Sequence, residues 1–218
     1  MIRWLLRTIF PPKCAICERV LPKNQTDFCT DCRETAQECK KSHFRISFLA
    51  GWTAVWYYKD AVRMGLIRYK FRHRRCYAPA FGRKLAMKLQ EECLTDFDIL
   101  TFAPISALRK ARRGYDQVAL LAKTVGRELG IDSCRTLRKI RNTPPQSDIT
   151  DPARRRANVL GAYKAVSPEL IRGKRILLLD DIITTGATAS ECARVLLTAG
   201  AKEVYCAALA VSNYKNSR

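Results

Sequence analysis

The chain has 218 residues, which is enough to bury one α/β core and still carry a small additional module. Its hydrophobic content of 47% is ordinary for a globular protein, and no apolar run approaches membrane-spanning length, which excludes a transmembrane protein. Forty lysines and arginines against twenty acids give a formal charge of +20, which favours a polyanionic partner.

The first ten residues have the pattern of an amphipathic helix. Their apolar members are spaced for one helical face: Ile2, Leu5, Leu6 and Ile9. Two arginines interrupt any hydrophobic core, and Pro11-Pro12 follows without a small-residue cleavage site. We therefore expect a docking helix in place of an export signal, and a cytoplasmic protein.

Four of the ten cysteines form two C-x-x-C knuckles separated by eleven residues: Cys14, Cys17, Cys29 and Cys32. Each knuckle can wrap two thiolates around a metal, and two knuckles complete a tetrahedral site suited to Zn²⁺. Four thiolates leave no position for water, so the predicted zinc is structural. A redox-active pair and cysteines that simply pack are the alternatives. Residues 1–35 are thus predicted to be the helix and a zinc-binding module.

Residues 36–95 are interpreted as an intermediate segment, with a strand over residues 51–58 and a helix marked by Phe81, Leu85 and Leu89. Residues 61–90 hold nine lysines or arginines and no acid. Aromatic rings Tyr69, Phe71 and Tyr77 are interleaved with them, as on a surface for single-stranded nucleic acid. The predicted nucleic-acid contacts are Arg68, Lys70, Arg72, Arg74 and Arg75. The alternative is that this charge serves a nearby diphosphate site.

Residues 96–218 alternate between strands and helices, which predicts a parallel sheet with ligands at the carboxyl ends of its strands. We expect strands over residues 98–105, 176–179 and 203–211, and a helix from about Val118 that ends at Gly130.

The most informative stretch is residues 174–190, in which a buried strand is followed by Asp180 and Asp181, a small polar turn and a helix. Free backbone N–H groups at the start of the helix, threonine hydroxyls and Gly186 together form a nest for a phosphate. The two acids can hold sugar hydroxyls or a hydrated Mg²⁺. A ribose 5-phosphate fits this pattern, and an ordinary strand-to-helix turn is the structural alternative.

Residues 176–188 resemble the signature with which type I phosphoribosyltransferases bind phosphoribosyl pyrophosphate (PRPP). The resemblance implies a catalytic role for Asp180 and Asp181 and binding of PRPP together with Mg²⁺. It also implies that the phosphate is held by the turn and the start of the helix, at Thr184, Thr185, Gly186, Ala187 and Thr188.

The cysteine module in front of such a domain resembles the ComF (ComFC/GntX-type) family. So do Ala103-Pro-Ile105 and the element from Arg109 to Gln117, in which Asp116 replaces the usual asparagine. The runs 141–146, 155–158 and 161–163 extend the similarity. The resemblance implies a pyrophosphate loop near Ala103 with Arg109, Lys110 and Arg113 beside it, and a mobile loop over residues 143–158 that closes on the diphosphate.

This family resemblance implies a protein of DNA uptake and natural transformation that handles single-stranded DNA, partners a helicase or a recombination mediator, and keeps a PRPP site. Two alternatives remain: an active phosphoribosyltransferase that uses an unidentified acceptor, and a non-catalytic PRPP sensor.

Overall fold

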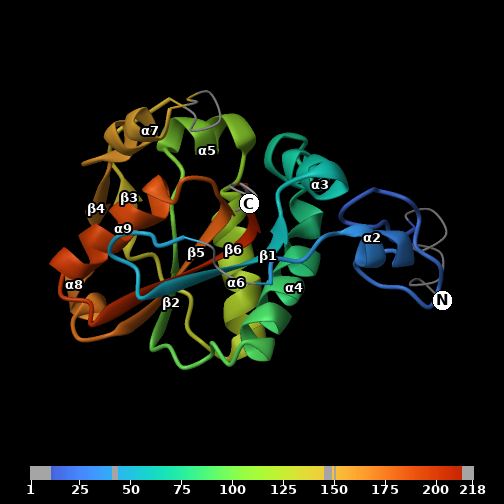
Figure 1. The fold of residues 1–218 in the computed structure, drawn as a ribbon, viewed down its shortest axis with the longest axis horizontal. Helices are drawn as coiled ribbons and strands as arrows, with labels where there is room; N and C mark the ends of the chain where they lie inside the picture. Colours follow the sequence, from blue (N-terminus) through green and yellow to red (C-terminus); the bar gives the residue numbers. More distant parts are fainter. Residues whose placement is uncertain (1–10, 41–43, 145–148, 150, 213–218) are drawn as a thin grey trace.

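The computed structural model describes residues 11–40, 44–144, 149 and 151–212. At its centre is a four-stranded, all-parallel sheet in the order β1-β6-β5-β2 (Figure 1). Its strands are β1 (Gly51–Tyr57), β2 (Ile99–Phe102), β5 (Arg175–Ile183) and β6 (Glu203–Val211). The predicted parallel α/β fold is confirmed, and β1, from the intermediate segment, forms one edge of the sheet.

Helices cover both faces of the sheet because the central strand β5 is apolar on both sides. Leu177 and Leu179 face a core shared with α4 (Ala78–Glu91) and α6 (Gln117–Leu129). The alternate residues of β5 face the opposite core with α9 (Ala187–Thr198). This period of two is what a strand buried on both faces requires.

The remaining elements surround this layer structure. They are α2 (Thr30–Thr35), α3 (Asp60–Phe71), the 3₁₀ turn Arg75–Tyr77, α5 (Ala107–Arg113), β3 (Leu137–Lys139), α7 (Pro152–Val159), β4 (Tyr163–Ala165) and α8 (Pro168–Ile171). Strands β3 and β4 form a separate antiparallel pair in which Lys139 is opposite Tyr163. This pair packs beside α9 (Figure 1).

The boundaries of three predicted elements can be compared directly. The helix predicted to end at Gly130 is confirmed, with this glycine in the left-handed conformation at φ 69°. The strand expected over residues 98–105 is shorter and ends at Phe102, since Pro104 lacks a donor for a ladder. Strand β5 is longer than expected because β6 pairs with it as far as Ile183. The helix predicted for the first ten residues lies outside the described residues.

The expectation of a loop throughout residues 143–158 is wrong for its last part, which forms α7. Asp151 caps this helix by accepting hydrogen bonds from the N–H groups of Ala153 and Arg154. Pro152 occupies the first turn, where its missing N–H costs nothing. The proline and aspartate that suggested a loop are therefore the start signal of a helix.

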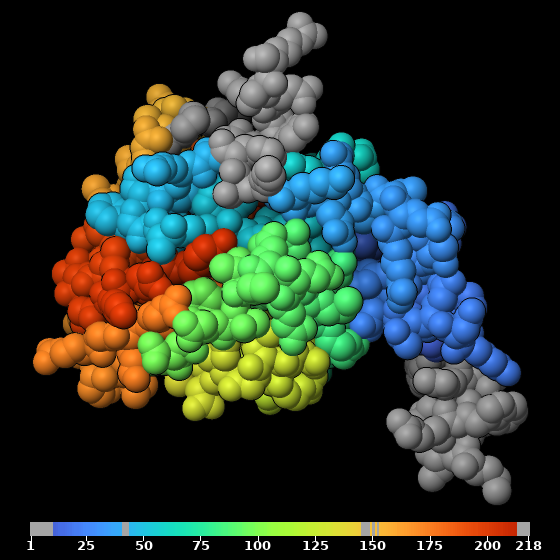
Figure 2. All heavy atoms as spheres, turned by 60° about the horizontal axis from the view of Figure 1, so that its bottom comes forward, coloured from blue at the N-terminus to red at the C-terminus, as the bar shows by residue number. Residues whose placement is uncertain are grey.

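The cysteine module forms a lobe at one side of the molecule and contacts α3 and α4 (Figure 2). The Phe28 ring lies 5.7 Å from the Trp56 ring and 6.0 Å from the Phe81 ring. Arg83 of α4 donates a 2.9 Å hydrogen bond to Asp27. At Gly65 of α3, an added Cβ would lie 3.0 Å from the backbone of Ile16. The module is thus packed directly against α3, the helix that contains Arg68 and Lys70 of the predicted nucleic-acid contacts.

Among the described residues, no helix combines the length and the apolar character that a membrane span needs.

We expect Gly65→Val to destabilise the fold by about 1–3 kcal/mol, because the new side chain overlaps the backbone of Ile16. Urea unfolding measures this as a lower midpoint at an unchanged slope. Ala61→Val adds the same type of side chain at an exposed position of α3 and is the control. Equal midpoints for the two variants would contradict the close approach of the module to α3.

Candidate functional site

Two adjacent carboxylates lie near the carboxyl end of the sheet. Asp180 and Asp181 belong to the last residues of β5 and are only 9% and 6% exposed. The sequence pattern predicted that the strand ends before these two residues. In the structure β5 continues through them, because it pairs with β6 as far as Ile183. Ligands of open parallel sheets bind at this edge, so the acid pair lies where a ligand is expected.

Asp181 is held by one partner on each side. The Lys70 ammonium from the last turn of α3 lies 2.8 Å from its Oδ1, and the Gln117 amide at the start of α6 donates to its Oδ2 at 2.7 Å. Burial by itself raises the pKa of Asp181, but Lys70 and Gln117 outweigh that effect and the pKa is lowered. Asp181 is therefore ionised.

Asp180 has the opposite electrostatic character. Burial raises its pKa, and the negative charge of Asp181 raises it further. Its Oδ1 accepts the backbone N–H of Asp181 at 2.8 Å. A cation or a hydroxyl donor placed beside Asp180 would relieve this unfavourable charge, so the pair is suited to a ligand with a diol or a bound cation.

The turn after β5 leads into α9 and exposes the first N–H groups of this helix. Gly186 adopts φ 76°, and a Cβ there would lie 2.7 Å from the Ile46 side chain. A side chain at this position would therefore strain the backbone and displace Ile46. The Thr185 hydroxyl is buried and has no hydrogen-bond partner in the described part of the chain. Thr184 in the turn and Thr188 at the start of α9 are the threonines that line the cavity.

A cavity of about 560 Å³ brings the predicted phosphate turn and the predicted pyrophosphate loop together. The loop contributes Ala103, Pro104 and Ile105, and the turn contributes Thr184, Gly186, Ala187 and Thr188. Both aspartates line the same cavity, as do the cations Arg63, Lys70, Arg109, Arg113, Lys139 and Arg155. Thr185 and Lys110 do not line it, and Lys110 is exposed on α5.

The two predicted pyrophosphate arginines that line the cavity are fixed by polar contacts. Arg109 donates to the Thr143 carbonyl at 2.6 Å, and Arg113 donates to the Gln117 side chain at 3.0 Å. Burial and the nearby Arg109 charge lower the pKa of Arg113. Such crowding of like charges favours an anionic ligand between them.

Gln117 and Lys139 belong to the site, but no function was assigned to either residue from the sequence. Gln117 belongs to the run that resembles the ComF element, but only the fold brings it to Asp181. Lys139 lies 5.1 Å from the Tyr163 ring centroid, and burial together with the Arg109 charge lowers its pKa to about 8. Lys139 is one of forty basic residues, and no local signal distinguishes it from the others.

The nine lysines and arginines of residues 61–90, called the basic tract below, do not form one free surface. Arg74 pairs with Glu18 at 2.7 Å, Arg68 donates to the Ile16 carbonyl, and Lys70 is held by Asp181. Arg72 and Arg75 are exposed. The interpretation of Tyr69 and Tyr77 as rings for base stacking is wrong, since both are buried against the core. Three of the five predicted nucleic-acid contacts thus have partners inside the protein.

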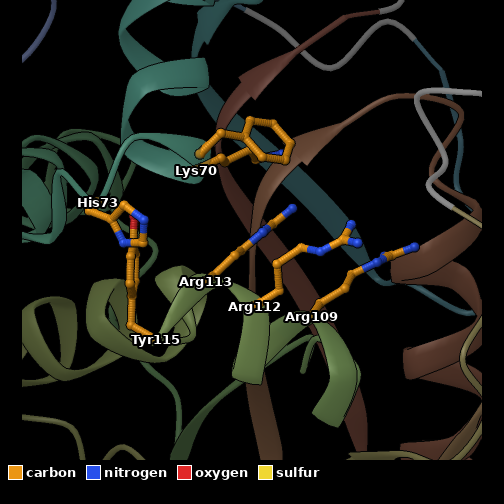
Figure 3. Close-up of a pocket in the computed structure, with 7 residues that line it drawn as sticks. Lys70, His73, Arg109, Arg112, Arg113 and Tyr115 are labelled. Carbon is orange, nitrogen blue, oxygen red and sulfur yellow. The ribbon is translucent and has the colours of Figure 1, made fainter.

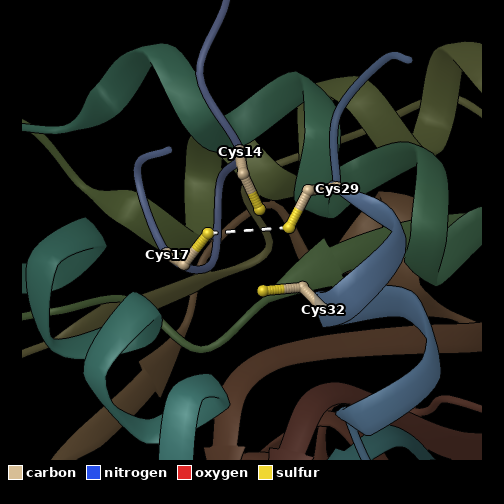
Figure 4. A group of neighbouring side chains, drawn as sticks. All are labelled: Cys14, Cys17, Cys29 and Cys32. Carbon is tan, nitrogen blue, oxygen red and sulfur yellow. Dashed lines mark hydrogen bonds between the residues drawn. The ribbon is translucent and has the colours of Figure 1, made fainter. Parts of the chain in front are cut away.

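The four cysteines of the two knuckles point toward a common centre (Figure 4). Their sulfurs all lie within 4.8 Å of one another, and the Sγ atoms of Cys17 and Cys29 are 3.6 Å apart. A tetrahedral ion with bonds of 2.3 Å separates its sulfurs by about 3.8 Å, so this cluster fits a single metal ion.

The thiol environment is consistent with metal binding. Burial raises the pKa of the Cys17 and Cys32 thiols. Burial also acts on Cys14, but backbone N–H groups that point at its sulfur outweigh it and lower the pKa. Four adjacent thiolates need a cation to be stable together, and a bound metal supplies it.

Comparison with known proteins agrees with this geometry. Residues 113–218 match the family model described as Phosphoribosyl transferase domain. Competence protein ComFC of Bacillus subtilis is 30% identical over 188 residues, which cover 86% of this chain and 72% of that protein. Competence protein F of Haemophilus influenzae is 33% identical over 103 residues, or 46% of this chain. That match spans only 44% of the relative's own length.

Among solved structures, glutamine PRPP amidotransferase from B. subtilis, complexed with ADP and GMP, is similar over 65% of this chain and 30% of its own. The sequence identity is 23% and the TM-score is 0.44.

We expect Lys70→Met to lower the free energy of unfolding near neutral pH by about 2 kcal/mol or more, because Asp181 stays buried without its ammonium partner. A carboxyl with a lowered folded pKa stabilises the fold above its unfolded pKa and loses that contribution as the pH falls through the folded pKa. Without Lys70, burial instead raises the pKa of Asp181, so proton uptake at low pH relieves the loss.

Urea unfolding of wild type and Lys70→Met at about pH 8 and about pH 5 measures this difference, which should be larger at the higher pH. Lys84→Met removes the lysine of a more exposed pair with Glu38 and is the control. A loss of equal size at both pH values would show that Lys70 does not offset the Asp181 charge.

Proposed function

The chain belongs to the ComF family of the type I phosphoribosyltransferase superfamily, and we propose that it binds Mg-PRPP and handles single-stranded DNA during DNA uptake and natural transformation. The proposed binding of PRPP is supported by one observation: the acid pair, the predicted phosphate turn and six basic residues line the same cavity. The names of the relatives, competence protein ComFC and competence protein F, support the DNA part.

In this proposal the ribose 5-phosphate binds at the N-terminus of α9. Gly186 allows the phosphate to approach the backbone, and the hydroxyls of Thr184 and Thr188, which line the cavity, donate to it. Asp180 and Asp181 then face the ribose hydroxyls. One phosphate end and one diol end match the two ends of the ligand.

The pyrophosphate of PRPP binds beside Arg109 and Arg113 of α5, and Lys139 of β3 is a further cation that lines the same cavity. Mg²⁺ takes oxygen ligands, and Asp180 is the better carboxylate for it because both oxygens of Asp181 already have partners. When bound, the ion neutralises charge on the pyrophosphate leaving group.

Transfer of the phosphoribosyl group to an acceptor is a second candidate activity. The acid pair and the cations that line one cavity favour it, because cations beside a pyrophosphate stabilise it as a leaving group. The acceptor itself is not indicated by the residues that line the cavity.

We further propose that the cysteine cluster in the module of residues 1–35 holds a structural Zn²⁺ and that the protein acts in the cytoplasm, where four reduced thiols persist. The net charge of +20 supports contact with single-stranded DNA, and a helicase or a recombination mediator is the expected protein partner of such a complex.

Calorimetric titration of Mg-PRPP tests the central proposal. Wild type should bind, and Asp180→Asn/Asp181→Asn should bind at least about tenfold more weakly, because a charged hydrogen bond to the ribose is lost. Asp132→Asn/Glu169→Gln removes the same charge from two exposed positions and should bind like wild type. A folded, metal-loaded wild type that does not bind Mg-PRPP would contradict the proposal.

The metal proposal predicts about one zinc ion per chain in freshly purified protein, measured by elemental mass spectrometry. Cys14→Ser should lose the zinc and the packing of the module on α3, because a three-cysteine site is incomplete. Cys93→Ser changes an exposed cysteine outside the cluster and should keep the metal. Protein purified without zinc or another bound metal would refute the metal site.

A further inference from the structure

A second, smaller cavity of about 200 Å³ lies beside the large one, between the end of α3 and helix α5 (Figure 3). Its lining residues are Lys70, Phe71, His73, Arg109, Arg112, Arg113 and Tyr115. Four of them also line the large cavity: Lys70, Phe71, Arg109 and Arg113. The two cavities are therefore neighbouring parts of one depression.

The small cavity is strongly cationic. Four of its lining residues carry a positive charge and none is an acid; Lys70 is paired with Asp181, so the three arginines supply the charge for a ligand. The three arginines extend from α5 in a similar direction (Figure 3), and Arg112 is exposed. Arg112 lines the small cavity and not the large one. Arg112 therefore adds a positive charge that a ligand in the large cavity does not contact. A phosphate group other than those of that ligand suits this position.

An aromatic ring completes the small cavity. Phe71 is 58% exposed, whereas the neighbouring ring of Tyr69 is fully buried. The Arg113 guanidinium lies 4.5 Å from the centroid of the Phe71 ring. An exposed phenylalanine beside arginines provides a flat apolar surface next to a phosphate site, which is the arrangement that a base and its phosphate need.

We propose that this small cavity binds one nucleotide unit of single-stranded DNA, with the phosphate at Arg112 and Arg113 and the base against Phe71. The inference rests on the proposed DNA-handling function and locates its contact site. The proposed DNA contacts therefore include Arg112 and Arg113 of α5, in place of most residues of the basic tract. Arg68 and Arg74 have partners in the cysteine module. Phe71, His73 and Arg112 are exposed and line one cavity, whereas Arg72 and Arg75 are exposed but do not line it.

The shared lining residues connect the DNA site to the PRPP site. Arg113 donates to Gln117, Gln117 donates to Asp181, and Asp181 binds Lys70, which precedes Phe71 in the chain. A DNA phosphate and a pyrophosphate therefore draw on the same cations at short range. Each ligand lowers the affinity for the other, and thermodynamic linkage requires the two effects to be equal.

Fluorescence anisotropy with a labelled oligothymidylate tests the inference. Arg112→Glu and Phe71→Ala should each raise the Kd at least about fivefold, through the lost phosphate contact and the lost stacking surface. Arg127→Glu makes the same charge change near the far end of α6, outside both cavities, and should bind within about twofold of wild type. Circular dichroism and urea unfolding establish that each variant is folded.

The outcomes distinguish failure of the DNA-handling function from failure of the assignment of DNA binding to the small cavity. Absence of oligonucleotide binding by wild type would refute the DNA-handling function itself. Binding by wild type with an unchanged Kd in both Arg112→Glu and Phe71→Ala would overturn the cavity assignment alone. An equal loss in Arg127→Glu and Arg112→Glu would also overturn it, because the effect would then be one of net charge. A saturating concentration of Mg-PRPP should raise the Kd of wild type, and an unchanged Kd would contradict the shared cations.

Discussion

The ionised carboxylate of Asp181 is the charge on which the arrangement of the site depends. It is buried, so it needs partners, and it has one from α3 and one from α6. Lys70 and Gln117 therefore fix the ends of two helices relative to β5. Burial and the charge of the ionised Asp181 both raise the pKa of the adjacent Asp180, so a cation or a hydroxyl donor beside it would be favourable. One buried ion pair thus sets both the geometry and the electrostatic character of the cavity.

The cysteine module is tied to the same helix. Arg68 of α3 donates to the Ile16 carbonyl, and Glu18, beside the first knuckle, pairs with Arg74. Gly65 allows the close approach of the two segments. A metal bound by the four cysteines would therefore also fix the segment around Ile16, against which α3 packs. Lys70 lies two residues after Arg68 on this helix and pairs with Asp181, which gives the module a physical connection to the cavity that holds the acid pair.

Sequence reasoning was most successful where the determinants are local. The strand-to-helix turn at Gly186 and the paired C-x-x-C spacing each depend on residues close together in the chain, and the structure places both as expected. Reasoning failed where a local pattern had two interpretations. Asp151 and Pro152 suggested a loop and begin a helix, and the ring of Tyr69 suggested base stacking and is in the core.

The sequence by itself determined the parallel α/β class, the strand-to-helix turn at Gly186 and the four-cysteine cluster, because periodicity, glycine and cysteine spacing act over short stretches. Only the tertiary structure decided which of forty basic residues belong to the site. Lys70 of α3 pairs with Asp181, and Lys139 of β3 lines the same cavity, although the two elements are far apart in the chain. A cation's role depends on which acid or ring it reaches after folding, and spacing along the chain does not contain that information.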